Sequence, residues 1–89
     1  MVLMVTYDLN KVKDYKKLYA ANQALGVTKR DPNLDSVWFV STASTPEQAS
    51  AYIKRATDAD DVHFVCRVRI ADCAGWMNQD VWKFIEVNG

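Results

Sequence analysis

The residue whose type and place in the chain best suit chemistry is Asp8. It follows an apolar run, Met1 to Tyr7, whose β-branched and aromatic residues are typical of a buried strand. Such a strand would deliver one carboxylate to the edge of a sheet. Magnesium takes hard oxygen ligands and keeps several waters, so one or two carboxylates suffice to bind it. Asp8 is therefore the candidate catalytic and metal-binding residue. The alternative is an aspartate that accepts backbone N–H bonds at the strand-to-helix turn.

No second catalytic group accompanies Asp8 in the sequence. His63 is the only histidine, and neither a Ser-His-Asp nor a Cys-His arrangement surrounds it. Its place in an alternating strand predicts a polar surface residue. Cys66 and Cys73 form no C-x-x-C pair, which favours two reduced thiols in a cytoplasmic protein. A catalytic site built on Asp8 would therefore need a second copy of it, supplied by a homodimer.

Basic residues gather at two places and predict contacts with the phosphates of RNA or DNA. Four lysines crowd the start of the first predicted helix, the end at which the helix macrodipole disfavours positive charge. Two arginines lie on one side of a later strand. The alternative is a solvated charged face, which fits eleven basic and eleven acidic residues with a formal net charge of zero. The candidate nucleic-acid-binding residues are Lys11, Lys13, Lys16, Lys17, Arg67 and Arg69.

The elements that must position these residues follow from apolar spacing and capping signals. With 89 residues, the chain is expected to be a single domain, 1–89. The clearest signal is Thr45-Pro46 followed by Gln48, which is typical of a capping box with proline at the first helical position. The predicted order begins with a strand over 1–8, a helix capped by Asn10 and ending at Leu25, and a short strand or loop after Gly26. It continues with a strand over 36–42, a helix from Pro46 to near Thr57, a strand over 62–70 and a tail over 71–89.

This order predicts an α+β sandwich of the ferredoxin-like kind, with two helices on one face of a four-stranded antiparallel sheet. The tail adds a short helix, Asp80 to Glu86, or a strand. The other face of the sheet is expected to stay open unless a partner covers it. No apolar run is long enough for a membrane span, so no membrane association is expected. Three tryptophans are expected to be core or interface anchors, namely Trp38, Trp76 and Trp82.

Short stretches of the chain resemble a known superfamily. The start Val5-Thr6-Tyr7-Asp8-Leu9, the strand Ser36-Val37-Trp38-Phe39 and the predicted layout resemble the small CRISPR-associated nuclease family, which forms one superfamily with the VapD toxins. The tail from Gly75 to Trp82 is similar to that of small bacterial and phage proteins labelled SinR-like.

The resemblance implies a homodimer in which two copies of the first-strand aspartate face each other. In members with nuclease activity, these aspartates bind a magnesium ion that activates water for phosphodiester cleavage. In this chain the resemblance assigns the role of that aspartate to Asp8. Ser36 matches a position that is often polar near the site in the family. Where the family often has arginines early in its first helix, this chain has Lys16 and Lys17.

Two hypotheses about function result. In the first, the chain is a metal-dependent nuclease-like or nucleic-acid-binding homodimer, with Asp8 as the catalytic residue and Mg²⁺ as the cofactor. In the second, the same fold is a catalytically inactive module that docks on a partner protein in a phage–host or toxin–antitoxin setting. The first requires activity that depends on Asp8 and magnesium, and the second does not.

Overall fold

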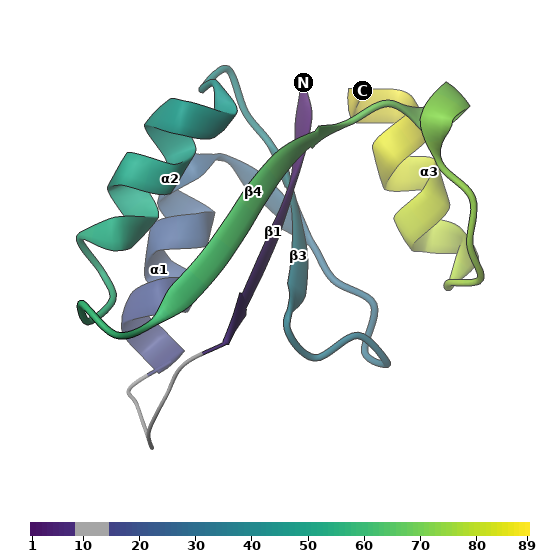
Figure 1. The fold of residues 1–89 in the computed structure, drawn as a ribbon. Coiled ribbons are helices and arrows are strands. Elements are labelled where there is room, and N and C mark those ends of the chain that lie inside the picture. Colours follow the sequence, from purple (N-terminus) through teal and green to yellow (C-terminus); the bar gives the residue numbers. More distant parts are fainter. Residues whose placement is uncertain (9–14) are drawn as a thin grey trace.

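The computed structural model of the chain describes residues 1–8 and 15–89. Its four strands form one antiparallel sheet in the order β2-β3-β1-β4. Figure 1 shows α1 and α2 on one side of this sheet and α3 on the other. The predicted ferredoxin-like α+β sandwich is therefore confirmed. Along the chain the elements are β1 (Val2–Asp8), α1 (Tyr15–Leu25), β2 (Val27–Lys29), β3 (Val37–Ser41), α2 (Pro46–Lys54), β4 (Val62–Val68), a 3-10 turn η1 (Ile70–Asp72) and α3 (Gln79–Asn88).

The core on the α1 and α2 side is built on alternate residues of β1. Successive side chains of a strand point to opposite faces of the sheet. Val5 and Tyr7 are buried in one cluster with Leu18 of α1 and Ile53 of α2. Residues of even number in β1, beginning with Val2, therefore point to the face that α3 partly covers.

Strand β3 is buried on both faces, as its nearly continuous apolar sequence predicts. Trp38 and Val40 belong to the core beside α1 and α2. Phe39, between them, packs with Val81 and Ile85 of α3. The helix that the sequence predicts after Thr45 follows β3 as α2.

Helix α2 begins with the predicted capping box. The backbone N–H of Gln48 donates to the Thr45 hydroxyl oxygen at 3.2 Å, and the Thr45 N–H donates to the Gln48 side chain at 3.0 Å. The helix ends at Lys54, three residues before the expected end at Thr57. The expected Asn10 cap of the first helix lies outside the described residues.

Gly26 follows α1 because the chain there passes the backbone of β3 at close range. A Cβ atom at this position would collide with the carbonyl oxygen of Ser41. Gly26 does not adopt a positive φ, so it ends α1 without the left-handed cap that glycine often supplies. Glycine is required at this position because a side chain would not fit beside Ser41, and not because of the backbone conformation.

The tail forms α3 and corrects the expectation that the second sheet face stays open. Its helix is longer than predicted and buries Val81 and Ile85 against one end of that face. Asp31, in the loop after β2, accepts the backbone N–H of Asn78 at 2.8 Å, and Lys29 pairs with Asp80 at 2.8 Å. These two contacts hold the start of α3 against the β2–β3 region.

Replacing Asp31 with Ala is expected to loosen α3. The Asp31 side chain is 2% exposed and accepts N–H groups of Asn78 and Asn33, and these bonds lower the pKa of its carboxyl. Its stabilising contribution is thus present above the ordinary pKa of 3.8 and is lost as pH falls through the lower folded value. Limited proteolysis should cleave the tail faster in Asp31→Ala than in Asp35→Ala, an exposed aspartate of the same loop. Equal cleavage rates would contradict this attachment.

Replacing Asn22 with Leu is expected to stabilise the protein. Asn22 of α1 is fully buried, and neither atom of its side-chain amide has a hydrogen-bond partner within the described chain. A buried unpaired amide costs about 1–3 kcal/mol. Asn22→Leu should therefore raise the free energy of unfolding by about 1 kcal/mol and Tm by about 4–8 °C. The neighbouring core substitution Leu18→Ala should lower the free energy by about 2–5 kcal/mol. A lower Tm for Asn22→Leu would show that the amide is satisfied in solution.

Candidate functional site

Asp8 lies at the last position of β1 and is exposed. It pairs with Val62 of β4, and its even position places it on the sheet face opposite α1 and α2. Helix α3 packs at the other end of that face, around Val2 and Val68. Asp8 therefore occupies the end of the face that α3 leaves uncovered.

Tyr7 anchors the end of β1 from the other side of the sheet. Its hydroxyl accepts the indole N–H of Trp38 at 3.2 Å and donates to the carbonyl of Asp35 at 3.4 Å. Burial raises the pKa of Tyr7, so the neutral phenol can make both bonds. Arg30 lies over the Trp38 ring at 4.8 Å and donates to the Asp35 carbonyl at 2.6 Å. These contacts hold the side chain of Tyr7, the residue before Asp8, and the β1–β4 pairing with Val62 positions the Asp8 backbone.

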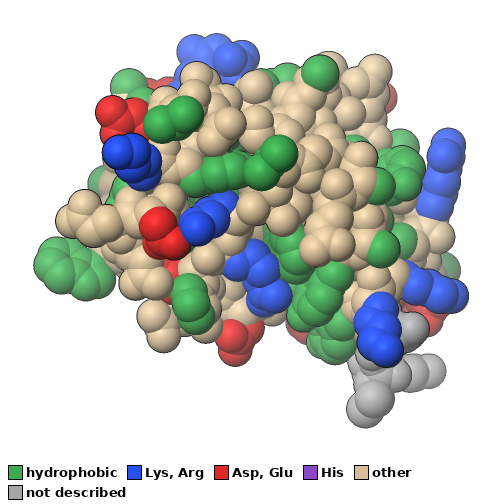
Figure 2. All heavy atoms as spheres, turned by 180° about the vertical axis from the view of Figure 1, so that it is seen from behind, with side chains coloured by type: hydrophobic (Ala, Val, Ile, Leu, Met, Phe, Trp, Pro, Cys, Tyr) green, Lys and Arg blue, Asp and Glu red, His purple; other side chains and the backbone are tan. Residues whose placement is uncertain are grey.

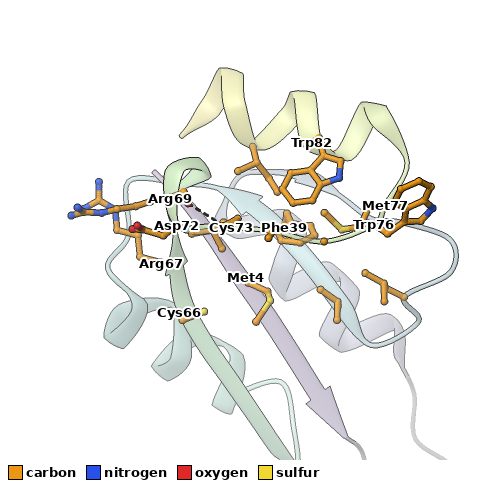
Figure 3. Close-up of a pocket in the computed structure, with 16 residues that line it drawn as sticks. Met4, Phe39, Cys66, Arg67, Arg69, Asp72, Cys73, Trp76, Met77 and Trp82 are labelled. Atoms are coloured by element: carbon orange, nitrogen blue, oxygen red, sulfur yellow. Dashed lines mark hydrogen bonds between the residues drawn. The ribbon is translucent and has the colours of Figure 1, made fainter.

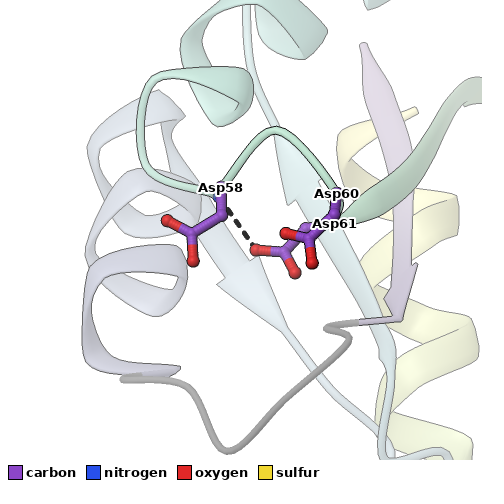
Figure 4. Close-up of side chains that lie close together, drawn as sticks. All are labelled: Asp58, Asp60 and Asp61. Atoms are coloured by element: carbon purple, nitrogen blue, oxygen red, sulfur yellow. Dashed lines mark hydrogen bonds between the residues drawn. The ribbon is translucent and has the colours of Figure 1, made fainter.

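An acidic loop precedes the residue that pairs with Asp8. Asp58, Asp60 and Asp61 bring carboxylate oxygens within 4.8 Å of one another, a spacing that could hold a cation. Figure 4 shows them between α2 and β4, where Asp61 accepts the backbone N–H of Asp58 at 2.9 Å and closes the turn. The sequence alone predicts only a turn-like acidic loop at these residues. The local negative charge attracts cations toward this corner and repels a bare phosphate.

The predicted nucleic-acid-binding residues do not form one patch. Lys16 and Lys17 are exposed on α1, in the layer opposite the Asp8 face. Arg67 pairs with Leu3, so it lies five positions along β4 from Val62, about 17 Å away. Figure 2 shows basic side chains scattered over one face in several places, with acidic and apolar side chains among them. Arg69 follows β4 at the same end as Arg67, and Lys11 and Lys13 lie outside the described residues.

Two exposed apolar side chains flank Asp8 on the uncovered face. Val62 and Phe64 of β4 are 61% and 60% exposed. The sequence correctly predicts that they share a face with Cys66 and Val68. It does not predict that this apolar face is the exposed one, because that depends on how far α3 reaches across the sheet.

His63 is not the surface residue that the sequence predicts. It is half-buried on the side of the sheet that carries α2, and its Nε2 lies 2.6 Å from the Ser50 hydroxyl. Burial and the charge of Lys54 lower the pKa of His63. The neutral imidazole therefore links β4 to α2 and is turned away from Asp8.

A cavity of about 780 Å³, the tail cavity, lies between the sheet and the tail. Figure 3 shows Met4 and Phe39 on the sheet side and Met77 and Trp82 on the tail side. Trp76, at the rim, is 100% exposed. The full lining comprises Met4, Leu34, Val37, Phe39, Cys66, Arg67, Val68, Arg69, Asp72, Cys73, Ala74, Gly75, Trp76, Met77, Trp82 and Ile85.

Both cysteines line the tail cavity as free thiols. Burial and the neighbouring Cys73 raise the pKa of Cys66, which keeps its thiol protonated near neutral pH. Cys73 donates to the carbonyl of Arg69 at 3.0 Å. Neither arrangement activates a nucleophile.

Comparison of the chain with protein-family models, curated proteins and solved structures found no match. The resemblance to the small CRISPR-associated nucleases therefore stays a prediction that rests on short sequence stretches. None of the helices in the described ranges is long and apolar enough to cross a membrane.

The His63 contact predicts a pH dependence of stability. Because the folded-state pKa lies below the ordinary value of 6.5, the unfolded chain binds more protons as pH falls below 6.5. The stabilising contribution is thus complete above pH 6.5 and decreases toward the folded-state pKa. Urea unfolding between pH 5 and 8 should show a smaller loss on acidification for His63→Gln than for the wild type. Identical pH profiles for the two proteins would contradict a half-buried imidazole that stays neutral in the folded state.

Proposed function

We propose that the protein is a nuclease-like homodimer in which two uncovered sheet ends face each other and bring two copies of Asp8 together. The observation that carries this proposal is the exposure of Asp8 beside Val62 and Phe64. Burying these apolar side chains against a second copy would favour association by about 25 cal/mol per Å² of apolar surface. A two-fold axis near Asp8 would place the carboxylates opposite each other.

Two carboxylates facing each other repel unless a cation lies between them. Magnesium suits this position because it binds through one or two carboxylates and retains waters. When bound, it would lower the pKa of a water and offset charge on a phosphodiester. The acidic loop before Val62 would add to the attraction for the cation. Asp8 would hold the ion, and the pairing of β1 with Val62 of β4 would position Asp8.

RNA or DNA is the proposed substrate class. The phosphate contacts would come from the two copies together, since the described lysines and arginines of one chain are dispersed. Two free cysteines fit a cytoplasmic location.

A second candidate function is a catalytically inactive module that docks on a partner protein. The dispersed basic residues and the fully exposed Trp76 favour it, because exposed aromatic side chains are frequent anchors of protein interfaces. This function needs neither Mg²⁺ nor Asp8.

Asp8→Asn separates the two functions, because it keeps the size of the side chain and removes its charge. The wild type is expected to cleave labelled single-stranded or duplex RNA or DNA only with Mg²⁺. Asp8→Asn should reduce the rate at least 100-fold, while Asp72→Asn, in η1 beyond the far end of β4, should retain it. Sedimentation of each variant reports whether the dimer persists. A dimeric wild type that cleaves none of these substrates would contradict the nuclease and favour the docking module.

A further inference from the structure

We propose that two copies exchange Trp76 side chains, each indole packing into the tail cavity of the other copy. This inference rests on the proposed homodimer and assigns its anchor residue and receptor site. The partner copy would thereby complete a cavity that one chain leaves open.

Trp76 is placed as an anchor for another molecule. It is the only large apolar side chain in the described residues that is fully exposed. Figure 3 shows it at the rim of the tail cavity, directed away from Met4 and Phe39. Its own chain offers it no packing, and a fully exposed indole leaves a large apolar area in water.

The tail cavity suits an uncharged aromatic side chain. Its volume of about 780 Å³ exceeds that of one indole ring and leaves room for adjustment. Met4, Met77, Phe39 and Trp82 line it, and methionine adapts well to aromatic partners. Figure 3 shows the side chains of Arg67, in β4, and Arg69, just after it, extending away from Met77 and Trp82. The charged lining residues, Arg67, Arg69 and Asp72, thus lie at one end of the cavity, away from its aromatic end.

A second copy is the occupant that the position of the cavity favours. Cys66 lines the cavity, and Phe64, two positions away on β4, points to the same face. Phe64 and Val62 thus lie on the same sheet face as the tail cavity, on the side toward Asp8. In a two-fold interface, if Trp76 contacts the cavity of the partner, the partner's Trp76 contacts this cavity. The anchor and its receptor both lie on the face that would be shared.

The area of the exposed side chains is adequate for such an interface. Burying Trp76 removes up to about 250 Å² from water, and the exposed part of Phe64 adds about 120 Å². Two copies together would bury about 740 Å² from these residues alone. Stable interfaces begin near about 1,200 Å², so neighbouring residues such as Val62 need to supply only the remainder.

The test is the association of the full chain, measured by sedimentation across a dilution series. Trp76→Ala is expected to weaken the dimer about 30-fold or more, as truncation of an aromatic anchor does. Tyr52→Ala removes an exposed aromatic side chain from α2, on the other face, and should leave association unchanged. A dimer equally strong in Trp76→Ala and the wild type would overturn the proposal and leave the homodimer itself standing.

The thiols in the cavity provide a second readout at the site. Cys66 and Cys73 should react with a maleimide several-fold more slowly in concentrated wild-type protein than in dilute protein. In Trp76→Ala the two rates should be equal. If the wild-type thiols react equally fast at all protein concentrations, the proposal that an indole inserts into the cavity is overturned. A monomeric wild type would overturn the homodimer as well, whereas loss of cleavage alone, with a Trp76-dependent dimer, would overturn only the nuclease.

Discussion

Strand β1 is the constraint on which the rest of the structure depends. It is hydrogen-bonded on both sides, to β3 and to β4, so its side chains must alternate between two packing environments. Leu3, Val5 and Tyr7 point toward α1 and α2, and Val2 and Met4 point toward α3. The same alternation directs Asp8 away from the helical layer. Its position on the uncovered face is thus a consequence of the register that builds the core.

Helix α3 determines how much of the second face remains exposed. It packs at the end near Val2 and leaves the end near Asp8 uncovered, with Phe64 exposed beside it. The tail that leads into α3 borders the open tail cavity and leaves Trp76 in solvent. A domain of 89 residues buries a smaller fraction of its surface than a large domain does, so its folded state has little margin of stability. Association through this face would bury the apolar side chains that the single chain leaves exposed, such as Phe64 and Trp76.

The sequence predicts the fold well because its signals are local. Alternation predicts the shared faces of β4, continuous apolar residues predict the double burial of β3, and Thr45 with Gln48 predicts the start of α2. The site depends on contacts between distant residues, which local patterns do not encode. Asp31 holds Asn78 across 47 positions, and the partner of His63 is on another element. The acidic loop lies near Asp8 only because of the β1–β4 register.

Hydrogen–deuterium exchange at high and low protein concentration tests most directly whether the uncovered face is the surface of self-association. Face-to-face docking predicts slower exchange at high concentration in two segments, residues 62–66 of β4 and residues 73–78 of the tail. Exchange in α1 and α2 should not change, because both lie in the opposite layer. Exchange that is independent of concentration, or slowed only in α1 and α2, would contradict the proposed dimer and the site that it would form.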